Sequence, residues 1–150
     1  MDNTQNKIVN ILMADDDDDD YFLVKTALKN SDLPHVLFHV PNGEELMNYL
    51  LRKEPYTNTQ EHPFPTIILL DLNMPKKDGR EALAEIKSNQ ELCKIPIVVL
   101  STSNNKDDIF KCYKLGVNSY IRKPADYKHL VNIFQAFKKY WFEVVELPEE

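Results

Sequence analysis

Five short apolar runs, each the length of a β-strand, recur along the chain and limit the folds that it can adopt. Several of them show no alternation of polar and apolar residues, which indicates strands that are covered on both faces. Strands of this kind are typical of a parallel sheet. The runs are residues 8–14, 35–40, 66–70, 95–100 and 118–122.

The segments between these runs carry apolar residues at helical spacing. Val24, Ala27 and Leu28 would share one helix face, and so would Leu130 and Phe134 near the end of the chain. Right-handed crossover connections place such helices on both faces of a sheet. We therefore predict a doubly wound α/β domain with a five-stranded parallel sheet, whose ligand site lies beyond the carboxyl ends of the strands.

An unbroken run of six aspartates, residues 15–20, follows the first predicted strand. The chain of 150 residues has 24 acidic and 18 basic side chains, so this run alone accounts for the formal net charge of −6. Negative charge of this density attracts cations and repels nucleic acid and anionic lipid headgroups. No apolar stretch approaches the roughly 20 residues needed to span a bilayer. We expect neither a nucleic-acid partner nor a membrane.

Three carboxylates are predicted to converge at one edge of the sheet. Asp15 and Asp16 follow the first strand and Asp71 follows the third, where the carboxyl ends of parallel strands meet. Carboxylates held close together repel one another, and a divalent cation removes that conflict. Oxygen ligands without histidine or thiolate favour a hard ion, so we predict a Mg²⁺ site that Mn²⁺ can also occupy.

Hydroxyl and ammonium groups are predicted at the same edge. Ser101 and Thr102 follow the fourth strand, and Lys123 follows the fifth. An ammonium group can hold an oxygen of a bound anion, and a hydroxyl group can donate a hydrogen bond to it. With Asp71 as the nucleophile, these are the groups needed to take up a phosphoryl group. The predicted product is an aspartyl phosphate on Asp71.

The other four aspartates of the run, residues 17–20, have a different explanation. They fall on the loop and the first turn of the next predicted helix. Carboxylates there can accept hydrogen bonds from free backbone N–H groups and favour the positive end of the helix dipole. We predict a structural and electrostatic role for these four residues.

Four sequence blocks in a fixed order make the chain resemble the receiver domain of two-component response regulators. The stretch LLDLNMPKKDG, residues 69–79, carries the phosphoacceptor motif, and ILMADD, VVLST and SYIRKP supply the other blocks. The resemblance covers about residues 7–140, and four ordered blocks are far more specific than any one of them. It implies the flavodoxin-like receiver fold and a signalling protein that is not an enzyme.

The resemblance also implies a metal site and a phosphorylation site. Asp71 corresponds to the phosphorylated residue. Asp16, Asp71 and the backbone carbonyl of Asn73 correspond to the metal ligands, with Asp15 acting on the metal through a water molecule.

The resemblance implies a conformational switch as well. Ser101 corresponds to the switch hydroxyl, with Thr102 beside it, and Lys123 corresponds to the lysine that binds the phosphoryl group. Tyr120 corresponds to the aromatic residue that changes rotamer when Ser101 moves. The face that would then repack is formed by the fourth helix, the fifth strand and the fifth helix.

The end of the chain resembles a narrower group, the single-domain receivers associated with bacterial phytochromes. The shared features are a long loop, residues 53–65, and the tail KKYWFEVVELP, residues 138–148, which in that group helps to form a dimer. We predict a receiver domain over residues 1–140 and a C-terminal extension over residues 141–150. The sequence leaves open whether the extension packs on its own domain or forms a homodimer.

The resemblance implies protein partners. A sensor histidine kinase, phytochrome-like in the narrower comparison, or a phosphotransfer protein would supply the phosphoryl group, and a downstream protein would receive the signal. No basic helix-turn-helix segment follows the predicted domain, so DNA binding is not expected. Cys93 and Cys112 have no metal-binding spacing, and we interpret them as the reduced thiols of a cytoplasmic protein.

Two alternative functions fit the sequence less well. Aspartate-nucleophile phosphatases usually carry a second aspartate two residues after the nucleophile, whereas this chain has Asn73 there. A divalent-metal-binding module of the EF-hand type would need a glycine and a glutamate where the chain has Asp20 and Thr26.

Overall fold

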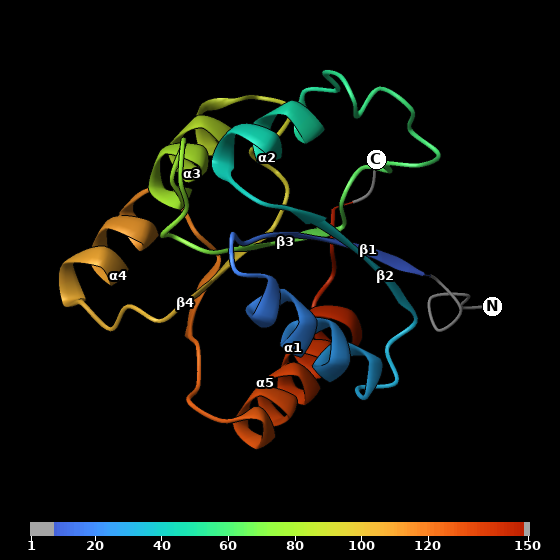
Figure 1. Ribbon diagram of the computed structural model, residues 1–150, viewed down its shortest axis with the longest axis vertical. Helices are drawn as coiled ribbons and strands as arrows, with labels where there is room; N and C mark the ends of the chain where they lie inside the picture. The colour runs from blue at the N-terminus through green and yellow to red at the C-terminus, as the bar shows by residue number, and fades with distance from the viewer. Residues whose placement is uncertain (1–7, 149–150) are drawn as a thin grey trace.

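The protein is described by a computed structural model over residues 8–148, which contains a five-stranded parallel sheet with helices on both faces (Figure 1). The strand order is β2-β1-β3-β4-β5, and each neighbouring pair is parallel. The predicted doubly wound α/β fold is confirmed. The elements are β1 (Val9–Ala14), α1 (Asp18–Lys29), β2 (His35–Val40), α2 (Gly43–Leu50), β3 (Ile67–Leu70), α3 (Gly79–Ser88), β4 (Ile97–Ser101), α4 (Lys106–Lys114), β5 (Ser119–Arg122), α5 (Tyr127–Lys139) and η2 (Tyr140–Val144).

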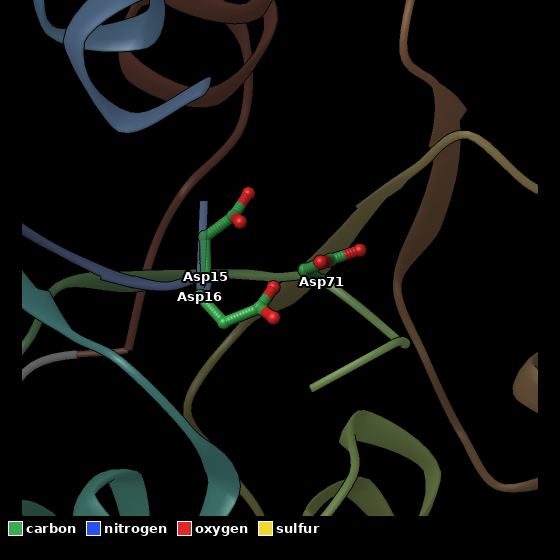
Figure 2. A group of neighbouring side chains, drawn as sticks. All are labelled: Asp15, Asp16 and Asp71. Carbon is green, nitrogen blue, oxygen red and sulfur yellow. The ribbon is translucent and has the colours of Figure 1, made fainter. Parts of the chain in front are cut away.

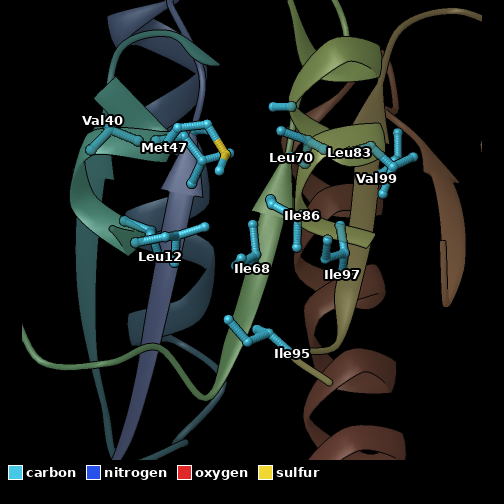
Figure 3. Packing of buried hydrophobic residues seen from close by; sticks show 14 of the residues in the cluster. Leu12, Val40, Met47, Ile68, Leu70, Leu83, Ile86, Ile95, Ile97 and Val99 are labelled. Atoms are coloured by element: carbon cyan, nitrogen blue, oxygen red, sulfur yellow. The ribbon is translucent and has the colours of Figure 1, made fainter. Parts of the chain in front are cut away.

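The sheet separates two hydrophobic cores. Helices α1 and α5 cover one face, and α2, α3 and α4 cover the other (Figure 1). Figure 3 shows part of the second core, where Leu12, Ile68 and Leu70 of the sheet pack near Met47 of α2 and Leu83 of α3. The sheet is therefore the middle layer of a three-layer domain.

The central strands are buried on both faces, as their apolar runs predict. In β1, Leu12 and Ala14 face the core under α2 and α3, whereas Ile11 and Met13 face the core under α1 and α5. This alternation follows from the two-residue period of a strand. The edge strands β2 and β5 are less buried. The burial of β1, β3 and β4 fixes the register on which the site depends.

Each of the five α-helices begins after an aspartate or asparagine whose side chain accepts hydrogen bonds from the first turn. In α1 this residue is Asp17, whose carboxylate accepts from the backbone N–H groups of Asp19 and Asp20 at 2.9 and 3.2 Å. The capping role predicted for the aspartate run is confirmed at Asp17. The capping residues are Asp17, Asn42, Asp78, Asn105 and Asp126.

The long segment between α2 and β3 contains no helix or strand, as predicted, but it is fastened to α2. The Tyr56 hydroxyl donates a hydrogen bond to the Glu45 carboxylate at 2.7 Å. The Tyr49 hydroxyl donates to the carbonyl oxygen of Pro63 at 2.8 Å. These two bonds hold the loop against the body of the domain.

The C-terminal tail continues α5 as one π-helical turn, η2. Trp141 and Phe142 are half-buried against the core under α1 and α5, and the ring centroids of Phe142 and Phe137 lie 5.8 Å apart. Tyr140 and Val144 remain 53% and 63% exposed. Residues 1–7 of the predicted receiver domain and residues 149–150 of the predicted extension lie outside the described residues. Within residues 8–148, no helix is both long enough and apolar enough to cross a membrane.

Candidate phosphoryl and metal site

The ends of β1 and β3 bring three carboxylates together. Ala14 and Leu70 are register partners, so the residues that follow them, Asp15 and Asp71, leave the sheet side by side. The backbone N–H of Asp71 donates to the carbonyl oxygen of Ala14 at 2.9 Å. Carboxylate oxygens of Asp15, Asp16 and Asp71 lie within 4.8 Å of one another (Figure 2).

The three carboxylates differ in their exposure to solvent. Asp15 is fully buried and Asp71 is 8% exposed, whereas Asp16 is exposed. Burial raises the pKa of Asp71 to about 6, and the negative charges of Asp15 and Asp16 act in the same direction, whereas Lys123 opposes the rise. Burial raises the pKa of Asp15 as well. A set of carboxylates in which two resist ionisation fits a hard divalent cation, which would favour the charged forms.

Lys123 connects β5 to this carboxylate group. Its Nζ lies 2.8 Å from Asp15 Oδ2 and 3.8 Å from Asp71 Oδ1, and its side chain is only 10% exposed. Burial disfavours the charged ammonium, but hydrogen bonds with Asp15 and Asp20 outweigh burial and raise the pKa of Lys123. The backbone N–H of Lys123 donates to the carbonyl oxygen of Ser101 at 2.7 Å, which ties β5 to the end of β4.

Asp20 belongs to this site, although the sequence pattern predicts only a structural role for it. Its Oδ2 lies 2.7 Å from Lys123 Nζ, as close as any other partner of that ammonium. Asp20 stands in the first turn of α1, and the direction of that turn, which a sequence pattern does not reveal, aims its side chain at β5. A contact between residues 103 positions apart has no local signal.

His39, near the end of β2, supports the site from outside. Its Nε2 donates to the carbonyl oxygen of Asp15 at 2.7 Å, and its ring stacks on that of Tyr21 with centroids 4.2 Å apart. The contact fixes the backbone of the residue that binds Lys123.

The predicted switch residues are connected through Ser103. Ser101, the last residue of β4, is buried, and its Oγ accepts from the backbone N–H of Ser103 at 3.2 Å. The Tyr120 hydroxyl donates to the carbonyl oxygen of Ser103 at 2.8 Å. Thr102, predicted beside Ser101 at the phosphoryl site, is exposed. Ser101 and Tyr120 therefore share one backbone segment as a partner.

Ser103 is also held from α3 and α4. Its hydroxyl donates to Asp108 Oδ2 at 2.8 Å, and the guanidinium of Arg80 lies 2.9 Å from Asp108 Oδ1. These hydrogen bonds and the charge of Arg80 lower the pKa of Asp108. The segment between β4 and α4 is thus hydrogen-bonded through Ser103 to both the sheet and α4.

The loop after β3 carries Asn73, whose backbone carbonyl is a predicted metal ligand. Asn73 is exposed, two residues beyond Asp71. The loop closes tightly at its end, where the backbone N–H of Gly79 donates to the carbonyl oxygen of Leu72 at 2.9 Å. A Cβ atom at Gly79 would overlap the carbonyl oxygen of Asp71, and one at Gly43 would overlap that of Lys77. Both glycines are required by close backbone approach.

Comparison with known proteins identifies relatives along nearly the whole chain. A family model described as the response regulator receiver domain matches residues 11–135. The response regulator Rcp1 of Synechocystis sp. is 43% identical over 148 residues, which are 99% of each chain.

Two solved structures combine high structural similarity with high sequence identity. The phosphorylated cyanobacterial phytochrome response regulator RcpA is 45% identical, with a TM-score of 0.88 over 95% of this chain and 100% of that chain. The Mn²⁺-bound form of response regulator Rcp1 is 43% identical, with a TM-score of 0.85 over 94% of this chain and 99% of that chain.

Proposed function

The chain belongs to the response regulator receiver family, whose members signal through phosphorylation, and from this premise we propose that Asp71 is the residue that takes up the phosphoryl group. The observation that carries the proposal is the convergence of Asp15, Asp16 and Asp71 with Lys123 at one edge of the sheet. The phosphatase alternative remains disfavoured because Asn73 cannot act as a general acid. The metal-binding alternative leaves Lys123 unexplained.

In the proposed reaction, a carboxylate oxygen of Asp71 attacks the phosphorus of a phosphohistidine. The bond from phosphorus to the imidazole nitrogen breaks, and its electron pair leaves with the imidazole. The ammonium of Lys123 binds a phosphoryl oxygen, and the hydroxyl of Ser101, with Thr102 beside it, donates to another. The reaction leaves the product on the protein, so the protein acts as a phosphorylated signal carrier and not as an enzyme.

The metal proposed for this site is Mg²⁺, for which Mn²⁺ can substitute. Asp16, Asp71 and the backbone carbonyl of Asn73 would bind it directly, and Asp15 would act through a water molecule. When bound, the ion neutralises negative charge on the transferring phosphoryl group. Three closely spaced carboxylates support this assignment.

The proposed output is a change in the surface formed by α4, β5 and α5. Phosphorylation would draw Ser101 towards the phosphoryl group, and Tyr120 would follow. The hydrogen bond from Ser103 to Ser101 and the one from Tyr120 to Ser103 support this route. Phosphorylation then biases a surface with two arrangements.

The proposed partners are proteins. The phosphodonor is a sensor histidine kinase, phytochrome-like by analogy with the named relatives, or a phosphotransfer protein. A downstream protein binds the altered surface, and no nucleic acid takes part. We also propose that the protein is cytoplasmic, because a histidine kinase takes its phosphoryl group from ATP in the cytoplasm.

The test is phosphorylation by acetyl phosphate or a phosphohistidine donor with Mg²⁺, read by mass spectrometry of the modified peptide. The wild-type protein should carry the phosphoryl group on Asp71, and Asp71→Asn should carry none, because an amide oxygen is a poor nucleophile. Asp19→Asn, which makes the same charge change at an exposed residue, should be labelled normally. Mg²⁺-dependent labelling that persists in Asp71→Asn would reject the proposal.

We also propose that the extension after residue 140 contributes to a homodimer. The support is that Tyr140 and Val144 are exposed, whereas Trp141 and Phe142 of the same tail pack against the core under α1 and α5. Val144→Glu should shift a dimer towards monomer in light scattering, because burying a charge at an apolar interface is costly. Leu51→Glu, at an exposed apolar residue that follows α2, should leave the mass unchanged. An unchanged mass for Val144→Glu would contradict the proposal.

A further inference from the structure

The ammonium of Lys123 is surrounded by three carboxylates at unequal distances. Nζ lies 2.7 Å from Asp20 and 2.8 Å from Asp15, both within hydrogen-bonding distance. Its distance to Asp71 Oδ1 is 3.8 Å, beyond that range. The ammonium is therefore hydrogen-bonded to Asp15 and Asp20, neither of which is proposed to be phosphorylated. It makes no hydrogen bond with Asp71, the proposed phosphorylation site.

Asp20 is held so that it keeps this contact. It lies in the first turn of α1, where its backbone N–H donates to the Asp17 carboxylate at 3.2 Å. Its side chain is 32% exposed, whereas those of Lys123 and Asp15 are 10% and 1% exposed. The contact between Asp20 and Lys123 thus lies where the buried site meets solvent. Its carboxylate comes from α1 and not from a strand end.

We infer that Asp20 is a positioning residue for phosphoryl transfer, which holds the Lys123 ammonium near Asp71 without allowing it to hydrogen-bond the nucleophile. The inference rests on the function proposed above for Asp71 and Lys123. Asp20 does not touch the reacting atoms, and it acts through Lys123.

The number of donors on an ammonium group supports this role. Lysine has three N–H donors, and Asp15 and Asp20 take two of them. The third remains for an oxygen of the phosphoryl group, which extends outward from Asp71. Lys123 can therefore bind the phosphoryl group without leaving Asp20.

The consequence of losing Asp20 follows from the same geometry. Lys123 would keep only Asp15 as a close partner, and its long side chain would be free to move towards the negative charge of Asp71. A hydrogen bond from the ammonium to Asp71 would occupy the lone pair that attacks phosphorus. Phosphorylation should therefore become slower.

The experiment compares single variants in the rate of phosphorylation by acetyl phosphate at saturating Mg²⁺. Asp20→Ala should be slower by about tenfold, the size of effect seen when a group that orients an active-site residue is removed. Asp19→Ala, which removes the same charge from the same helical turn without a contact to Lys123, should react at the wild-type rate. Asp20→Asn keeps an oxygen that can accept from Nζ and should react faster than Asp20→Ala.

A double variant separates positioning from a structural effect. In a Lys123→Ala background, Asp20→Ala should cause no further loss of rate, because the residue through which it acts is gone. A full additional loss there, an Asn variant as slow as the Ala variant, or an Asp20→Ala rate equal to or above that of the wild type would overturn the inference. If the wild-type protein itself is not phosphorylated on Asp71, the proposed function fails instead, so the two failures are distinguishable.

Discussion

The centre and the edge of the sheet differ in how firmly they are held. Strands β1 and β3 are buried on both faces and end in the carboxylate site. At the edge, β5 is only half-buried, and α4 buries a single residue, Cys112, while Phe110 and Tyr113 are 67% and 50% exposed. Strand β5 belongs to the same sheet as β1 and β3, and only β4 separates it from β3.

This difference matches the two tasks of a receiver. Phosphoryl transfer needs groups held at fixed distances, which the doubly covered strands supply. A signal needs a surface that can change its arrangement at little cost, and weakly buried elements are the ones that do so. The hydrogen bonds of Ser103 join the deeply buried region to the weakly buried one.

The largest expected effect compares a truncation at the centre with one at the edge. Leu70→Ala should lower the free energy of unfolding by about 2–5 kcal/mol, because Leu70 is fully buried and its loss leaves a cavity. Phe110→Ala should change it by no more than about 0.5 kcal/mol, because most of that ring is already in water. Urea unfolding measures both. Similar losses in the two variants would break the comparison.

An intermediate effect concerns the charge at the centre. The pKa of Asp71 is about 6 in the folded protein and near 3.8 when unfolded, so the folded state binds more protons between these values. Stability should fall as the pH rises through this window. Without divalent metal, Asp71→Asn should therefore be more stable than the wild type at pH 7 by about 1–3 kcal/mol, and the advantage should vanish below pH 4.

Thermal unfolding with and without Mg²⁺ measures this effect. Because the ion would favour the ionised carboxylate, Mg²⁺ should stabilise the wild-type protein more than Asp71→Asn. A difference in stability between the two proteins that did not change with pH would show that folding does not disfavour the charged form of Asp71.

A modest effect is expected where the two regions meet. Tyr120→Phe removes the hydroxyl that donates to the carbonyl oxygen of Ser103 and should cost about 1 kcal/mol in urea unfolding. Since Tyr120 is half-buried, the ring itself should stay in place. A loss of unfolding free energy as large as that of Leu70→Ala would show that the edge is held as firmly as the centre and would contradict the comparison.

Much of the fold follows from local pattern. The doubly buried strands have continuous apolar runs, and each strand end predicted to carry a polar residue does so within one or two residues of the observed boundary. Parallel strands bring those ends together, so the proximity of Asp15, Asp16 and Asp71 could be predicted from the sequence.

The contacts that the sequence did not reveal depend on tertiary geometry. Asp20 on α1 meets Lys123 beyond β5, 103 positions further along the chain, and His39 meets Asp15 because β2 is the neighbour of β1. Neither contact leaves a periodic trace in the chain. The loop before β3 shows the same limit, because only the fold brings Tyr56 to Glu45.

The two crowded glycines are positions where a mutation would disturb the site without removing any reactive group. A methyl group at Gly79 would displace the backbone of Asp71, and one at Gly43 would push on the carbonyl group of Lys77 in the loop between β3 and α3. Variants at these positions would retain every side chain that the chemistry requires and still fail. A mutational survey that considered only reactive side chains would therefore overlook them.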